Sequence, residues 1–228
     1  MVWLLILAAM ILGLALLPQM WVRKVIEAHS DDRPDFPGTG GEFARHLLDR
    51  LGLVHVKVEE TKLGDHYDPD AKAVRLLPAH FRGRSLAAVV IAAHEVGHAI
   101  QDATDYPPLK ARTRLAKQAQ KVEAVGAVVM LAAPVLMVIS KSPHLLLLQS
   151  FLGLLILALT ILIHASTLPM EFDASFRRAL PVLKAGNYIP PKDMRAARQI
   201  LRAAALTYVA AAAMSLFNVT RWFRVLRI

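Results

Sequence analysis

Two histidines and a glutamate close together in the sequence could do chemistry: His94, Glu95 and His98, in the order His-Glu-Val-Gly-His. On an α-helix about 3.6 residues complete a turn, so both imidazoles lie on one face and can reach one metal ion. This spacing suits a zinc ion that keeps one position open for water, with the glutamate as general base. The alternative is a pair of solvated histidines, but the flanking residues from Ile91 to Ile100 are uncharged outside the motif and mostly favour a helix.

A third ligand is expected, because a catalytic zinc usually has three protein ligands and an open position. The chain has no cysteine, so this ligand must be His, Asp or Glu. Glu171 is the candidate, because it follows an apolar hairpin that could return the chain to the same face. The alternative is a glutamate in the first turn of a helix, where it favours the helix dipole. Asp173 could bond to one of the histidines or be the ligand itself.

Further groups are expected around the metal. Asp102 lies one turn beyond His98, where it could orient that ligand or simply face water. The oxyanion formed during peptide hydrolysis needs a second donor besides zinc, and the sequence offers His66, Tyr208 and Arg202.

Helix signals surround the motif. Ser85 can cap a helix that runs to about Ala103 and is apolar except for the motif. Earlier in the chain, Thr39 and Glu42 form a capping box, and Gly52 can end the helix that this box begins.

Strand signals lie between these two helices. Residues 55–59 alternate as a strand should, residues 64–70 are rich in turn formers, and residues 73–77 are predicted to be a returning strand. Such a hairpin could pair with an extended peptide substrate or could only support the metal helix.

Composition indicates a membrane protein. Of the 228 residues, 55% are hydrophobic, and long apolar runs occupy residues 2–20, 122–139 and 145–163. A bilayer span needs about 20 largely apolar residues. The net charge is +9, but the basic residues border the apolar runs, which favours membrane lipids rather than nucleic acid as partners. Without cysteine, disulfides and thiolate ligands are excluded.

Four regions are therefore expected. They are a transmembrane anchor at 1–22, a catalytic region with the zinc-binding helix at 23–121, a transmembrane hairpin at 122–166, and at 167–228 the third-ligand helix with a C-terminal membrane-associated or spanning helix. The predicted fold class is a mainly α integral membrane protein with a small β-hairpin or sheet beside the zinc helix. Basic residues gather on one side of the spans, which predicts a multi-pass protein of the inner (plasma) membrane with its catalytic side in the cytoplasm. No pattern indicates an oligomeric state.

Three motifs together resemble a known family, the YugP-type membrane neutral zinc metallopeptidases. They are residues 94–101, the His66-Tyr67-Asp68-Pro69 stretch upstream and residues 168–175 downstream. The resemblance extends from the first apolar run to Tyr208. It implies a gluzincin-like catalytic unit, distantly similar to HtpX and the CAAX prenyl proteases.

The resemblance also implies roles for individual residues. His94, His98 and Glu171 match the zinc ligands, and Glu95 matches the catalytic base. One position departs from the HtpX-like pattern, because Ser175 stands where that pattern has an aspartate four residues after its glutamate. Asp173 could take over the orienting role.

These patterns predict a membrane-anchored, zinc-dependent endopeptidase that hydrolyses peptide bonds of membrane or misfolded proteins, with Glu95 as general base. One alternative is an intramembrane zinc protease, which the apolar run at residues 86–100 favours. The other is a non-catalytic, zinc-stabilised membrane scaffold or chaperone. That alternative leaves Glu95 without a use, because a structural zinc site needs no base.

Overall fold

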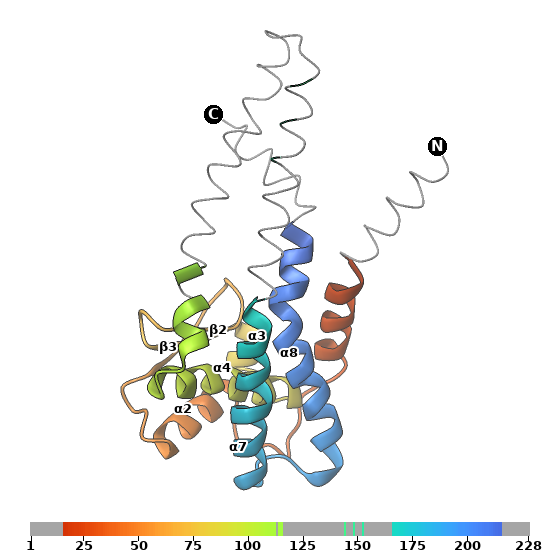
Figure 1. Ribbon diagram of the computed structural model, residues 1–228. Coiled ribbons are helices and arrows are strands. Elements are labelled where there is room, and N and C mark those ends of the chain that lie inside the picture. The colour runs from red at the N-terminus through yellow and green to blue at the C-terminus, as the bar shows by residue number, and fades with distance from the viewer. Residues whose placement is uncertain are drawn as a thin grey trace, which may run out of the picture. The chain divides into compact units, whose positions relative to one another are not determined.

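The structure is a computed structural model that describes residues 16–112, 114, 115, 144, 148, 152 and 166–215, with side chains up to residue 207 in the last range. The chain divides into two compact units. One of them, formed by residues 18–110 and 168–207, contains the zinc-motif helix and the residues packed around it (Figure 1). We call it the core unit.

Helix α4 (Leu86–Ala103) carries the motif and is buried along most of its length. It begins where the sequence predicts, because the Ser85 hydroxyl accepts a hydrogen bond from the Ala88 amide at 3.1 Å. A helix that is apolar all round must be covered on all sides. Helix α2 (Gly40–Arg50), helix α3 (Pro78–Phe81), the sheet and the π-helix η1 (Asp173–Ala179) all pack against α4.

Helix α2 confirms the predicted capping box. The Glu42 amide donates to the Thr39 hydroxyl at 3.2 Å, and the Thr39 amide donates to the Glu42 carboxylate at 2.8 Å. Gly52 follows the helix with a φ of +73°, a conformation that glycine adopts without a Cβ clash. The buried side chains Leu47 and Leu48 join the hydrophobic core that surrounds α4.

The predicted hairpin is wrong in its pairing. The sheet has three strands, β1 (Lys57–Glu60), β2 (His66–Asp68) and β3 (Ala73–Leu76), in the order β1-β3-β2. β1 runs parallel to β3, and β2 runs antiparallel to it. The segment expected to be a turn contains β2. Because the chain passes through β2 between the outer two strands, the β1-to-β3 connection is long enough for parallel pairing.

The second half of the core unit follows the apolar runs in sequence. Residues 166–172 are helical and lead into η1, which continues into helix α7 (Leu180–Ala185). A short 3₁₀ turn, η2 (Pro191–Asp193), precedes helix α8 (Met194–Ser215). Leu183, Ile200 and Leu201 from these helices belong to the same core cluster as α2 and α4.

The predicted membrane fold class requires correction. Among the described residues, no helix is both long and apolar enough to cross a membrane. α8 carries Arg195, Arg198 and Arg202 in its first half, and the part of the predicted C-terminal apolar run that the structure describes, residues 203–215, is shorter than about 20 residues. The fold described is mainly helical with a small three-stranded sheet, so the integral membrane class and the multi-pass localisation are wrong for this structure.

The predicted anchor and hairpin, residues 1–22 and 122–166, lie largely outside the described residues.

Candidate metal centre

His94 and His98 lie one turn apart on α4, with ring centroids 4.8 Å apart and ring planes at 80°. Each residue is only 2% exposed. Histidine is intermediate in its tendency to be buried, and buried polar atoms are almost always hydrogen-bonded, so two adjacent buried imidazoles need polar partners. Each ring has two nitrogens, and both nitrogens of both rings have such partners in the structure.

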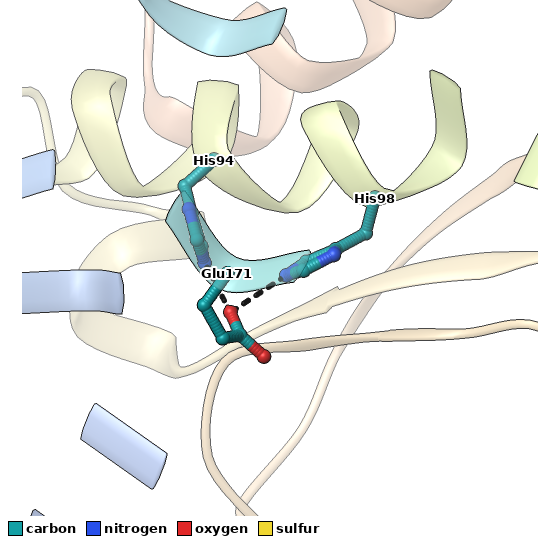
Figure 2. A group of neighbouring side chains, drawn as sticks. All are labelled: His94, His98 and Glu171. Atoms are coloured by element: carbon teal, nitrogen blue, oxygen red, sulfur yellow. Dashed lines mark hydrogen bonds and ion pairs between the residues drawn. The ribbon is translucent and has the colours of Figure 1, made fainter. Parts of the chain in front are cut away.

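Glu171 faces the two Nε2 atoms from the second half of the core unit (Figure 2). Its Oε2 lies 3.3 Å from His94 Nε2 and 3.1 Å from His98 Nε2, and the residue is fully buried. One ligand atom from each of the three side chains lies within 4.8 Å of the others, and such a group could hold a metal ion. The structure thus brings together the two histidines and the glutamate that the sequence singled out.

Gly97 allows the two halves of the centre to approach. A Cβ placed on Gly97 would lie 2.6 Å from the carbonyl oxygen of Ala174 in η1, closer than real Cβ contacts allow. The backbone of η1 therefore touches the backbone of α4 between the two histidines. This contact holds Glu171, three residues before Ala174, within reach of both imidazoles.

The π-helix changes which side chains face α4. In a regular α-helix, residues two apart point to nearly opposite sides. Asp173 and Ser175 are nevertheless both buried and both contact α4, Asp173 through Gln101 and Ser175 through His94. Wide π turns occur often at functional sites.

Hydrogen bonds hold the far side of each imidazole. His94 Nδ1 is 2.9 Å from the Ser175 hydroxyl, and His98 Nδ1 is 2.9 Å from Gln101 Oε1. The Gln101 side-chain amide donates to the Met170 carbonyl and to Asp173 Oδ2, both at 2.9 Å. Arg178 Nε contacts the same Asp173 oxygen at 3.2 Å.

The sequence reasoning missed these roles of Gln101 and Ser175. Weak signals existed, because Gln101 follows His98 at the three-residue spacing and Ser175 follows Glu171 at the four-residue spacing of one helix face. Neither spacing identifies the partner.

The charge of Glu171 is stabilised in the buried centre. Burial alone raises the pKa of its carboxyl group, but the charge of His98 and the hydrogen bonds from His94 and His98 outweigh burial and hold the pKa well below its usual range. A carboxylate at this place therefore requires a positive charge beside it, either a proton on an imidazole or a metal ion.

The other predicted site residues have different surroundings. Glu95 is 5% exposed on α4, adjacent in sequence to His94. The carboxylate of Asp102 is bonded to the sheet region rather than to His98. Its Oδ2 accepts hydrogen bonds from the Tyr67 hydroxyl at 2.6 Å and from Lys72 Nζ at 2.5 Å. Asp102 therefore ties the end of α4 to the sheet. Burial first, and then the bond to Asp102, raises the pKa of Tyr67, so its hydroxyl remains a donor at neutral pH.

The predicted oxyanion donors are not gathered at the centre by any contact that the structure records. His66 is half-buried on β2, with Nδ1 2.8 Å from the Gly64 carbonyl oxygen. Arg202 is exposed on α8, and the side chain of Tyr208 lies outside the described residues.

The donor set fits zinc. Two imidazole nitrogens and one carboxylate oxygen are one of the three-ligand sets that catalytic zinc uses, and such a site leaves a fourth position for water or substrate. The chain supplies no thiolate, and a divalent cation would balance the carboxylate while accepting both nitrogen lone pairs.

Comparison with known proteins points to the same chemistry. Residues 2–227 match a family model described as "Putative neutral zinc metallopeptidase". The chain is 34% identical over 213 residues to the "Putative membrane protease YugP" of Bacillus subtilis (strain 168). The matched stretch covers 92% of this chain and 91% of that protein. No solved structure shows a significant similarity to the chain. The chain therefore belongs to the neutral zinc metallopeptidase family, and the predicted enzyme class and zinc cofactor are confirmed.

Proposed function

We propose that the chain is a zinc-dependent endopeptidase in which His94, His98 and Glu171 hold the metal and Glu95 is the general base. The observation that carries this proposal is the convergence of three buried ligand atoms, with Glu171 Oε2 at 3.1 and 3.3 Å from the two Nε2 atoms. When bound there, zinc supplies a Lewis acid that lowers the pKa of water to about 7 and polarises a peptide carbonyl.

Glu95 supplies the proton transfers. Peptide hydrolysis needs a group that takes a proton from the attacking water and returns it to the leaving amine, and one carboxylate can do both. Glu95 is adjacent in sequence to the first histidine, on the rigid, buried helix that presents both imidazoles. Its position relative to the centre is therefore set by α4 rather than by a flexible loop.

The burial of the centre supports an unfolded substrate. His94, His98, Glu171 and Glu95 are all 5% exposed or less, so a peptide bond must reach a recessed site. An extended stretch of unfolded polypeptide can enter such a site, whereas the surface of a folded protein cannot. We therefore propose that the enzyme cleaves within unfolded or misfolded protein chains.

The test is Glu95→Gln in the full-length protein, with Glu27→Gln as matched control on an exposed helix surface. Wild type, Glu95→Gln and control should each bind one zinc per chain by metal analysis. Wild type and control should cleave an unfolded casein into internal fragments seen by mass spectrometry. Glu95→Gln should lose about 10²–10⁴-fold in rate, the typical share of general acid–base catalysis.

Undiminished cleavage by Glu95→Gln would exclude Glu95 as the base. Release of single terminal residues instead of internal fragments would make the enzyme an exopeptidase. Zinc-loaded wild type that cleaves no unfolded protein would favour the non-catalytic scaffold.

A further inference from the structure

We infer that Gln101 and Ser175 are positioning residues that hold His98 and His94 in the one tautomer able to bind metal through Nε2. A neutral imidazole carries its proton on either ring nitrogen, and only the nitrogen without it offers a lone pair to a metal. The inference rests on the proposed ligand roles of the two histidines, and the hydrogen-bond network assigns the tautomers.

For His98, the orientation of the Gln101 amide decides the tautomer. Gln101 Nε2 lies 2.9 Å from two acceptors, the Met170 carbonyl oxygen and Asp173 Oδ2. Both amide hydrogens are used there, so the NH₂ group cannot be exchanged with the oxygen without placing acceptors against acceptors. Gln101 Oε1 must then face His98 Nδ1, at 2.9 Å. That oxygen only accepts, so Nδ1 carries the hydrogen.

For His94, the direction of the single hydroxyl hydrogen of Ser175 decides the tautomer. Ser175 Oγ lies 2.9 Å from the carbonyl oxygen of Leu201, which can only accept. The hydroxyl hydrogen therefore points to Leu201, and Oγ accepts from His94 Nδ1 at 2.9 Å. Ser175 is fully buried, which excludes a competing hydrogen bond to bulk water.

Because Gln101 and Ser175 hold a proton on each Nδ1, the Nε2 atoms of both rings face the Glu171 carboxylate. Both Nε2 atoms lie 3.3 and 3.1 Å from Glu171 Oε2, so a metal ion that displaces any proton held there finds both nitrogens already aimed at it. A buried carboxylate beside two ring nitrogens needs a positive charge among them, which a metal ion supplies when it replaces a proton. The network therefore prepares the centre for a metal ion before the ion arrives, and the ion does not need to reorient either ring.

The acceptors that hold the imidazoles are neutral. Metal-bound histidines often donate their second N–H to a carboxylate, which makes the ligand nitrogen more basic. Here a carboxylate stands one step further away, because Asp173 acts on His98 through Gln101 and is itself in contact with Arg178 at 3.2 Å. Ser175 thus offers His94 Nδ1 an acceptor that carries no formal charge.

The experiment compares Ser175→Ala, Gln101→Met and Gln101→Glu in the full-length protein. Methionine removes the acceptor at nearly the same volume. Glutamate keeps an acceptor for His98 Nδ1, but its second oxygen replaces the NH₂ group and so faces two acceptors, Asp173 Oδ2 and the Met170 carbonyl oxygen. Two readouts apply: zinc affinity in competition with a chelator, and the imidazole N–H resonances of ¹⁵N-histidine-labelled, zinc-loaded protein. Wild type should show one Nδ1–H resonance protected from exchange with water for each of His94 and His98.

Ser175→Ala and Gln101→Met should each lose one protected resonance and bind zinc about 10- to 100-fold more weakly, as expected for outer partners of metal ligands. Gln101→Glu should melt at a lower temperature than wild type yet keep the His98 resonance and near wild-type affinity. Ser30→Ala and Gln199→Met are matched controls at exposed positions. Ser30 also donates to a backbone carbonyl, at 2.8 Å.

His98→Ala separates the two proposals. If His98→Ala binds zinc as tightly as wild type, the proposed ligand set fails. If His98→Ala loses zinc while Ser175→Ala and Gln101→Met keep both affinity and resonances, only the positioning roles are overturned. Equal loss of the His98 resonance in Gln101→Met and Gln101→Glu would also overturn the role of Gln101. Ser175→Ala removes a single oxygen and decides the question for His94 even if Gln101→Met does not fold.

Discussion

The two sides of the centre are built differently. α4 is a regular α-helix of 18 residues, capped at its start and buried against α2, the sheet and η1. The opposite side, Glu171 with η1, is a helix interrupted by seven residues of π-helix that begin two residues after the glutamate. α4 supplies two ligand candidates by regular spacing, whereas the other side supplies one ligand candidate and also Ser175, which bonds to His94.

This difference separates two requirements of a metal site. Regular spacing is enough to place two like ligands on one helix, since positions four apart share a face. Bringing a third group and its supports against that helix requires non-local packing, a glycine at the contact and a locally widened turn. The spacing of the regular side can therefore be read in a sequence, whereas the hydrogen-bond partners on the irregular side must be seen in a structure.

The largest effect is expected when Glu171, the ligand candidate on the irregular side, is removed. Glu171→Ala should weaken zinc binding by more than the roughly 100-fold upper range of outer partners, because a ligand is lost and not only its orientation. Chelator competition measures the affinity. Phe172→Ala, the exposed neighbour in the same segment, is the control and should bind zinc normally. Full zinc retention by Glu171→Ala would remove this residue from the ligand set.

The contact between the two sides can be tested at Gly97. In an open helix, Gly→Ala stabilises by up to about 1 kcal/mol. Here the new Cβ would meet the Ala174 carbonyl at 2.6 Å, so Gly97→Ala should instead lower the free energy of unfolding by about 2 kcal/mol, as overpacking does. It should also weaken zinc binding, because Glu171 is pushed away. Urea unfolding of the metal-free protein measures whether the free energy of unfolding falls or rises. A Gly97→Ala variant more stable than wild type would contradict the close approach of the two backbones.

The regular side has its own support at its C-terminal end. Tyr67→Phe removes the hydrogen bond to Asp102 and should cost about 1.5 kcal/mol, with little change in zinc affinity, since Asp102 does not contact His98. The raised pKa of Tyr67 means that this contribution is fully present below the unfolded pKa of about 10 and is lost as the pH rises above it. The difference between wild type and Tyr67→Phe in urea unfolding should thus be constant near neutral pH and shrink above about pH 10.

The smallest effect is expected far from the centre. Thr39→Ala removes the hydroxyl half of the capping box of α2 and should cost about 1 kcal/mol in unfolding free energy, while zinc affinity and cleavage rate stay unchanged. Thr104→Ala, which removes exposed hydrogen bonds after α4, is a suitable comparison. A drop in zinc affinity for Thr39→Ala would show that α2 and the centre are coupled.

Features set by neighbouring residues were predictable. Ser85 and Thr39 begin helices where the sequence places them, because capping depends on groups within one turn. The zinc motif, the family and the cofactor followed from residue types and spacing for the same reason. The sheet was predicted less well, since whether β1 and β3 run parallel depends on a pairing that short-range signals do not encode.

Features set by distant contacts were not predictable. Gln101 bonds to Asp173 across 72 positions, and Ser175 bonds to Leu201 and to His94 across 26 and 81 positions. Asp173 was expected to bond to a histidine or to be the ligand itself, and in the structure its Oδ2 contacts Gln101 and Arg178 from the π-helix that follows Glu171. The membrane fold class was predicted from the apolar runs at residues 2–20, 122–139 and 145–163, whereas among the described residues no helix is long and apolar enough to cross a membrane.

The separation of the ligand candidates has a consequence for how the protein is made. His94 and His98 come together as soon as α4 forms, whereas Glu171 joins them only after a loop of 73 positions has closed. Loop closure on this scale costs entropy before any contact repays it, so local helices form first and non-local contacts later. We therefore expect zinc to be captured at the end of folding, and a nascent chain released before Glu171 is synthesised should not retain it.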